Sequence, residues 1–126
     1  MNHPAAEPLI VSAPQTAPGL EARLALSVVV PCYNEAGAIG ELHRRVSQVC
    51  LASVGEDYEI VLIDDGSGDA TWGAIASLCA TDPHIIGLRL SRNYGQQLAL
   101  TAGLQECRGN LIFIIDADMQ DPPELL

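Results

Sequence analysis

The chain has 126 residues, and six arginines against sixteen Asp and Glu give a formal net charge of −10 at pH 7, with no lysine. This length fits one domain, and the acidic balance excludes the basic face that a nucleic-acid-binding protein needs. Hydrophobic residues make up 48% and charged residues 17%, which argues against a disordered chain and for a packed, mainly aliphatic core.

The N-terminal segment, residues 1–24, is rich in Ala and Pro and has no periodic apolar pattern. Because proline fixes φ and removes a backbone donor, we predict a disordered tail here, followed by one domain over residues 25–126. We expect no signal peptide and no membrane span, since no apolar run approaches about 20 residues. The four cysteines lack zinc-type spacing, so reduced thiols and a cytoplasmic location are expected.

Four short apolar runs rich in Val and Ile follow the tail, at residues 26–30, 58–63, 85–90 and 111–115. Their near-continuous apolar character is typical of strands covered on both faces. Helical spacing in the intervening segments gives the order β-α-β-α-β-α-β, whose crossovers make neighbouring strands parallel. The sequence therefore predicts an α/β, Rossmann-like parallel sheet with strand order 3-2-1-4.

Several local features of the predicted helices follow from the same pattern. Asp69 is the expected N-cap of the second helix, and Gly109 the expected C-cap glycine of the third. The third helix is expected to face the core through Leu100, Leu104 and Cys107. The two histidines of the domain, His43 and His84, have no evident catalytic partner, and we expect them to be solvated.

Polar residues follow every predicted strand, and the ends of parallel strands meet at one edge of a sheet. With the order 3-2-1-4, the first and fourth loops flank the topological switch point and should face the same ligand. Acidic residues gather at this edge: Asp64, Asp65, Asp116, Asp118 and Asp121. Carboxylates about 5 Å apart repel by about 3 kcal/mol at an effective dielectric near 20, so a cation is expected there. Hard oxygen ligands select Mg²⁺ or Mn²⁺, which usually also binds substrate phosphates.

A structural role competes with a functional one at some of these positions. Asp64 and Asp69 also suit turn and N-cap positions, and Glu35 also suits the positive end of a helix dipole. Tyr33 could line a flat base or simply cover the sheet edge. An apolar strand that runs directly into Asp116 and Asp118 has little structural reason, and this favours function.

Four segments in order resemble the family-2 glycosyltransferases of the GT-A fold: VVPCYNE at 29–35, IDDGSGDAT at 63–71, LSRNYG at 90–95 with AGL at 102–104, and DADMQDPPE at 116–124. The resemblance is strongest to the polyprenyl-phosphate sugar transferases, such as dolichol-phosphate mannose synthase and undecaprenyl-phosphate glycosyltransferases. Four motifs at these spacings form a far more specific signal than any one of them.

The resemblance implies an inverting transfer of sugar from a nucleoside-diphosphate sugar, a UDP- or GDP-sugar, to a polyprenyl phosphate. It implies Mg²⁺ or Mn²⁺ as cofactor, with metal ligands at Asp116, Asp118 and Gln120. The implied nucleotide-sugar contacts are Pro31, Tyr33, Glu35, Ile63, Asp65, Asp116, Ala117 and Asp118. Arg92, the only cation of its loop, could face the donor phosphates or form a surface salt bridge.

Members of the family continue beyond the point that corresponds to Leu126, with an acceptor-binding half that carries the general base, and many continue into membrane helices. We therefore expect an N-terminal fragment that holds the donor and metal half, whose parent acts at the cytoplasmic face of the membrane. The general base is expected beyond Leu126. The last apolar run would lie at an unpaired sheet edge, so self-association of the fragment is expected.

Three enzyme or signalling alternatives fit less well. A haloacid-dehalogenase-like phosphatase and a receiver domain both need a lysine, which is absent, and a dinucleotide oxidoreductase needs G-x-G-x-x-G after the first strand. A non-catalytic nucleotide-binding remnant stays open as the alternative to an enzyme.

Overall fold

The four apolar runs form the parallel part of a five-stranded sheet. The computed structural model of the chain describes residues 9–12, as backbone, and 23–118. Its elements are β1 (Leu9–Ser12), β2 (Leu24–Cys32), α1 (Ile39–Val54), β3 (Tyr58–Asp64), α2 (Thr71–Thr81), β4 (Ile85–Arg89), α3 (Gln96–Glu106) and β5 (Gly109–Ile114). The sheet order is β1-β4-β3-β2-β5. The parallel strands β2 to β5 thus have the predicted order 3-2-1-4, and the α/β fold class is confirmed.

The prediction of a disordered tail is wrong for one short stretch of the N-terminal segment. Leu9–Ser12 forms β1, which pairs antiparallel with β4, placing Leu9 opposite Arg89 and Ser12 opposite Ile86. The stretch is apolar, β-rich and free of proline, and β4 would otherwise leave its outer edge unpaired. The flanking prolines masked this signal, and the rest of the predicted tail, 1–8 and 13–22, lies outside the described residues.

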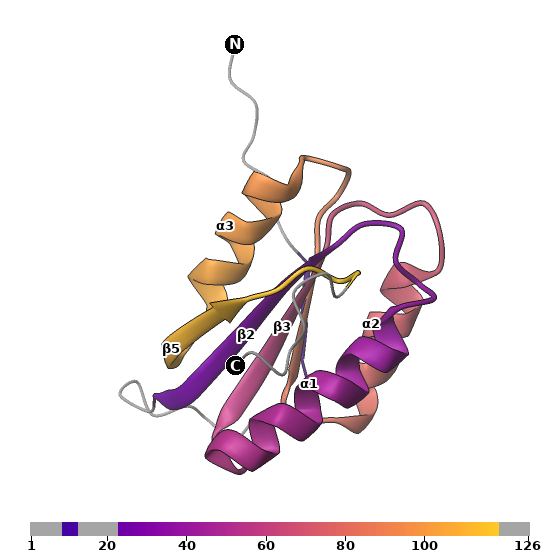
Figure 1. The fold of residues 1–126 in the computed structure, drawn as a ribbon. Coiled ribbons are helices and arrows are strands. Elements are labelled where there is room, and N and C mark those ends of the chain that lie inside the picture. Colours follow the sequence, from indigo (N-terminus) through magenta and orange to yellow (C-terminus); the bar gives the residue numbers. More distant parts are fainter. Residues whose placement is uncertain (1–8, 13–22, 119–126) are drawn as a thin grey trace.

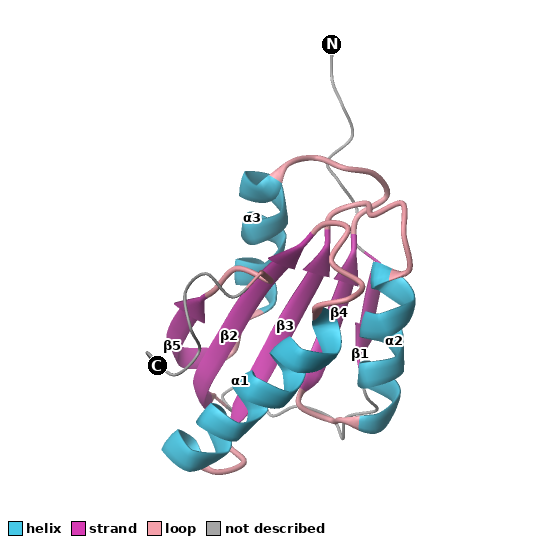
Figure 2. Ribbon diagram, turned by 45° about the vertical axis from the view of Figure 1, so that its right-hand side comes forward, coloured by secondary structure: helices cyan, strands magenta, loops and turns pink. Residues whose placement is uncertain are grey.

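Helices cover both faces of the sheet (Figures 1 and 2). Successive strand side chains point to opposite faces, so Val28 and Val30 pack with α1 and α2, whereas Val29 packs with α3. All seven residues of β3 are buried. The resulting three layers explain why the strands show near-continuous apolar runs and no alternation.

Helix α3 lies unusually close to the sheet. A Cβ at Gly103 would lie 2.6 Å from Cδ1 of Ile63 and 2.9 Å from Cγ1 of Val29. Ala99 and Gly103 are therefore the buried residues of α3, and the predicted core position Leu104 is exposed. Gly109 is also no helix cap: Cys107 caps α3 and Gly109 begins β5, where a Cβ would overlap the backbone of Ser27.

A buried carboxylate joins β2, β3 and β5 at the amino end of the parallel strands. Glu59 is 1% exposed, and its Oε2 accepts hydrogen bonds from the Ser27 hydroxyl and the Arg108 amide, both at 2.6 Å. The Arg108 Nε donates to the other oxygen at 3.2 Å, and the Gly109 amide donates to the Ser27 hydroxyl at 2.8 Å. This buried charge is therefore paired and hydrogen-bonded, as a buried charge must be.

The prediction that both histidines are solvated is wrong. His43 Nε2 lies 2.7 Å from Oδ2 of Asp82, and His84 Nδ1 lies 2.8 Å from Oδ1 of the same residue. His84 also stacks on Tyr58 with ring centroids 4.0 Å apart. Burial alone would raise the pKa of Asp82, but the hydrogen bonds from His43 and His84 outweigh it and hold that pKa below its usual value. The histidines tie α1 to the turn between α2 and β4, away from the carboxyl ends of the strands.

Strand β5 forms one edge of the described sheet, and apolar side chains lie exposed on it. Leu111 is 63% exposed, Ile112 41% and Ile114 45%, and both faces of the strand contribute. None of the helices in the described part is long and apolar enough to span a bilayer.

An exposed apolar edge strand favours pairing with a second copy, so we predict that the 126-residue chain self-associates through β5. Replacing Leu111 and Ile112 together by Gln should shift the weight-average mass in sedimentation equilibrium toward the monomer. Leu51→Gln, an exposed leucine on α1, serves as the control and should leave the mass unchanged. A wild-type chain that stays monomeric at every concentration tested would show the prediction to be wrong.

Candidate functional site

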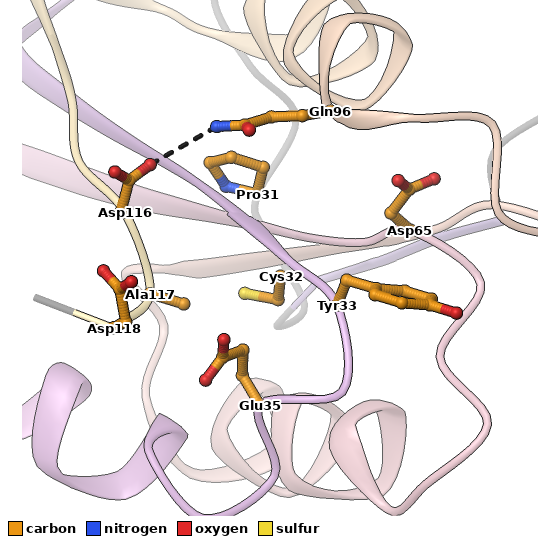
Figure 3. Close-up of a pocket in the computed structure, with 9 residues that line it drawn as sticks. All are labelled: Pro31, Cys32, Tyr33, Glu35, Asp65, Gln96, Asp116, Ala117 and Asp118. Atoms are coloured by element: carbon orange, nitrogen blue, oxygen red, sulfur yellow. Dashed lines mark hydrogen bonds between the residues drawn. The ribbon is translucent and has the colours of Figure 1, made fainter.

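A cleft of about 230 Å³ opens at the carboxyl ends of the parallel strands. It is lined by Pro31, Cys32, Tyr33, Glu35, Asp65, Gln96, Asp116, Ala117 and Asp118 (Figure 3). Most of these residues come from the segments that follow β2 and β5, which are neighbours in the sheet. The chain leaves β2 toward α1 on one face, and α3 covers the other face. The first and fourth loops thus line one cleft at the switch point, and their contact with one ligand stays a prediction.

Most residues with an implied ligand contact lie at this cleft. Ile63 and Arg92 do not line it: Ile63 is fully buried under α3, and the Arg92 guanidinium lies 4.8 Å from the ring centroid of Tyr94. Their contact with a nucleotide stays a prediction. Gln120 and Asp121 lie outside the described residues.

Short polar side chains bind the loop after β2 to the loop after β3. The backbone N–H of Asn34 donates to the Ser67 hydroxyl at 2.8 Å. The side-chain oxygen of Asn34 accepts from the backbone N–H of Gly68 at 2.9 Å. The Glu35 amide donates to the Thr71 hydroxyl at 2.9 Å. Asn34 has φ 53°, a left-handed conformation that asparagine tolerates better than most residues. These bonds fix the backbone on either side of the Tyr33 and Glu35 side chains.

Asp64 and Asp69 both form hydrogen bonds within the loop after β3. Asp64 is fully buried, and its Oδ1 accepts the Ser67 amide at 3.0 Å in a turn. Asp69 accepts the Thr71 amide at 2.9 Å and the Thr71 hydroxyl. The N-cap of α2 is Ala70, so the expectation that Asp69 is the N-cap is wrong by one residue. The Thr71 hydroxyl is the main cause of the lowered pKa of Asp69.

The sequence interpretation missed two residues of the cleft lining, Cys32 at the end of β2 and Gln96. Gln96 is the first residue of α3, and its side-chain Nε2 donates to Oδ1 of Asp116 at 3.3 Å (Figure 3). No motif contains Gln96, but the predicted strand order could have indicated its place in the cleft. The loop before α3 reaches the same sheet edge as the acidic segment after β5, and a polar residue at the start of that helix lies at that edge.

Four carboxylates line the cleft, from Glu35, Asp65, Asp116 and Asp118, and the lining holds no Lys or Arg. Among the described residues, no three His, Cys, Asp or Glu side chains are grouped to hold a metal by themselves. Mg²⁺, however, is commonly held by one or two carboxylates, with water and substrate phosphates as further ligands. The oxygen-only donor set of Asp116 and Asp118 fits such an ion.

The thiol in the cleft wall is inert as a nucleophile at neutral pH. Cys32 is 1% exposed. Burial, with further contributions from the negative charges of Asp64 and Glu35, raises the pKa of its thiol far above the usual value. Burial also raises the pKa of Cys50 and of Cys107 to about 11. Since the thiolate is the reactive form, none of these side chains suits covalent catalysis.

We predict slow reaction of the native chain with a disulfide reagent such as DTNB at pH 8, because the raised pKa values keep the thiols protonated. In guanidinium chloride all four cysteines should react rapidly, as the thiols regain their ordinary pKa. Absorbance of the released chromophore measures both rates. Rapid labelling of Cys32 in the native chain, identified by mass spectrometry, would contradict the assignment.

The loop after β3 also depends on one glycine. Gly66 has φ +70°, and a Cβ there would overlap the backbone of Arg92 in the loop before α3. We predict that Gly66→Ala destabilises the chain by about 2 kcal/mol or more, since a left-handed conformation costs an L-residue about 1–2 kcal/mol even without overlap. Urea denaturation measures the change. Gly68→Ala is the matched control, because no atom lies within 4 Å of its added Cβ; equal midpoints for the two variants would contradict the prediction.

A parallel sheet of order 3-2-1-4 with a cleft at its switch point is the arrangement in which α/β domains of this class bind their ligands. The chain matches the family model Glycosyl transferase family 2 over residues 27–126. It belongs to this glycosyltransferase family, which confirms the resemblance in the sequence and argues against the phosphatase alternative.

Two kinds of relatives support this assignment. The chain is 46% identical over 100 residues to undecaprenyl-phosphate 4-deoxy-4-formamido-L-arabinose transferase of Shewanella sediminis, covering 79% of this chain and 30% of the relative. Mannosyltransferase PcManGT from Pyrobaculum calidifontis, in complex with GDP-Man and Mn²⁺, has a TM-score of 0.66 at 28% identity over 81% of this chain and 30% of its own. The chain therefore spans about a third of the length of these relatives.

A second solved structure supports the fold alone. Staphylococcus aureus TarS 1-349 in complex with UDP-GlcNAc has a TM-score of 0.63 at 24% identity, over 75% of this chain and 27% of its own. Together with PcManGT, it confirms the GT-A architecture of the described sheet and helices.

Proposed function

We propose that this chain is the donor-binding half of a glycosyltransferase that binds a UDP- or GDP-sugar together with Mg²⁺ or Mn²⁺. The observation that carries the proposal is the acidic cleft at the switch point between β2 and β5, where the segment Asp116-Ala117-Asp118 follows β5. The chain is 46% identical over 100 residues to a named undecaprenyl-phosphate sugar transferase, and this supports a polyprenyl phosphate as the acceptor of the whole protein.

Electrostatics favours a cation in this cleft. A diphosphate that enters among four carboxylates, with no basic residue in the lining, is repelled unless positive charge lies between them. Asp116 and Asp118 would hold the ion, with Gln120 as a third ligand and phosphate oxygens or water completing the shell. When bound, the ion neutralises the negative charge that develops on the departing diphosphate. PcManGT, which carries both GDP-Man and Mn²⁺, supports this pairing of metal and donor.

The arrangement of the side chains gives the donor a direction in the cleft. Figure 3 shows Tyr33 and Asp65 on one side and Asp116 and Asp118 on the other. The ring of Tyr33 is 49% exposed and offers a flat surface for a base. The base would therefore lie toward Tyr33 and Asp65, and the diphosphate toward Asp116 and Asp118. The sugar would then lie beyond the diphosphate.

The remaining parts of the reaction belong to the whole protein. An inverting transfer needs a general base that accepts the proton of the acceptor, and this base would lie outside the 126 residues. We place the domain in the cytoplasm, with its parent at the cytoplasmic face of the membrane, where a lipid phosphate is reached. A non-catalytic remnant would bind the donor and transfer nothing. Transfer of a radiolabelled sugar by the full-length protein separates these two alternatives.

Calorimetry of the 126-residue chain with UDP or GDP tests the donor site. We expect binding that requires Mn²⁺ and disappears with EDTA, because the cation links the diphosphate to the carboxylates. Asp118→Asn should abolish this binding, since it removes one of the two proposed charged ligands. Asp57→Asn, which changes the same group at an exposed position at the opposite end of the sheet, is the control and should bind as the wild type does. Undiminished binding by Asp118→Asn would refute the metal assignment.

A further inference from the structure

The carboxylate of Asp65 holds the loop that precedes α3. Asp65 is 4% exposed; its Oδ1 accepts the Tyr94 amide at 2.9 Å and its Oδ2 accepts the Gly95 amide at 3.1 Å. Gly95 is the N-cap of α3 with φ 100°, a conformation that a side chain would strain. Hydrogen bonds to a charged acceptor are stronger than neutral ones. Asp65 therefore fixes the position at which α3 begins.

The next residue along the chain is Gln96, whose amide reaches across the cleft to Asp116. Its Nε2 donates to Oδ1 of Asp116 at 3.3 Å (Figure 3). A lysine or arginine here would orient the carboxylate too, but its charge would compete with a metal cation. The amide donates a hydrogen bond without bringing charge, so it orients the carboxylate and leaves its full negative charge available.

We propose that Gln96 is a positioning residue that orients the Asp116 carboxylate for the metal, and that Asp65 sets the position of Gln96 through the backbone of Tyr94 and Gly95. The inference rests on the proposed function and deepens it, because it assigns a part in metal binding to the residue that follows β3 and to the first residue of α3. Outer partners that orient a ligating carboxylate typically change metal affinity by about 10–100-fold when removed.

Asp65 has a competing role, direct contact with the nucleotide. Each carboxylate oxygen can accept more than one hydrogen bond, so the two backbone bonds do not by themselves settle its part. The two roles act on different equilibria. A positioning role lowers the affinity for the metal, whereas a direct contact lowers the affinity for the nucleotide even when the metal is saturating.

The experiment measures two affinities on the 126-residue chain, with UDP or GDP as the nucleotide. Mn²⁺ is titrated at saturating nucleotide by electron paramagnetic resonance, and the nucleotide is titrated at saturating Mn²⁺ by calorimetry. Gln96→Ala should weaken Mn²⁺ binding about tenfold or more and leave the second affinity and the melting temperature unchanged. Gln97→Ala removes the same side chain one position later, outside the cleft lining, and should change nothing.

Asp65→Asn and the double variant complete a thermodynamic cycle. If both residues act by one route, Asp65→Asn should weaken Mn²⁺ binding, and the double variant should lose less than the sum of the two single losses. An unchanged Mn²⁺ affinity in Gln96→Ala would overturn the inference. Equal losses of Mn²⁺ affinity and nucleotide affinity in this variant would overturn it too. Additive losses, or a loss confined to nucleotide affinity in Asp65→Asn, would also overturn the role of Asp65.

Two further outcomes keep the inference apart from the proposed function. If Asp65→Asn does not fold, the Gln96→Ala measurement still decides the part of Gln96, and hydrogen exchange at the Tyr94 and Gly95 amides of the wild type decides that of Asp65. Slow exchange of these amides supports their hydrogen bonds to Asp65, and fast exchange refutes them. A wild-type chain that binds neither Mn²⁺ nor nucleotide overturns the proposed function and, with it, the inference. Binding by the wild type with unaltered Gln96→Ala overturns the inference alone.

Discussion

The geometry of the cleft depends on the register in which β5 pairs with β2. Val28 lies opposite Phe113 and Val29 opposite Ile114, and the acidic segment follows immediately. A slip by one residue would move Asp116 and Asp118 by about 3.3 Å and turn every β5 side chain to the other face. The buried network of Glu59 opposes such a slip from the far end of the strands, because a shifted β5 would leave that charge unpaired, at a cost of about 3–5 kcal/mol.

The polar groups at the two ends of the sheet therefore have different structural roles. At the amino end, Ser27, Glu59 and Arg108 join three strands through a buried charge, and a histidine–aspartate cluster ties the helices to β4. At the carboxyl end the loops are held by hydrogen bonds that the side-chain oxygens of Asn34 and Asp65 accept from backbone amides. The acidic groups that face the cleft are thus placed by a frame that is already complete without a ligand, as preorganised sites require.

The sheet and the cleft could be predicted because they follow from patterns within short segments. Apolar runs that alternate with helical spacing predict parallel strands, and parallel strands place their loops at one edge. Strand β1 was missed because prolines on both sides hid a run of only four residues. Gly103 and Gly109 were misjudged because periodicity reports which face of an element is apolar and contains nothing about how closely two backbones approach.

The partners of the polar side chains were less predictable. His43 and Asp82 are 39 positions apart in sequence, and only the packing of α1 against the following turn brings them together. Gln96 belongs to no motif, and its place in the cleft follows from the length of the loop before α3. A pairwise contact between side chains from distant segments leaves no trace in one sequence, whereas a whole strand or a cluster of acids does.

The loops around the cleft separate the residues that hold the backbone from those that face a ligand. Asn34, Ser67 and Thr71 set the shape of the loop after β2 through their hydrogen bonds, whereas the neighbouring Tyr33 ring lies half in solvent. Position 33 is thus free to vary in size and polarity without altering the path of the chain. Such a frame lets a protein lineage exchange one ligand for another by single substitutions, each of which leaves a folded intermediate for selection to act on.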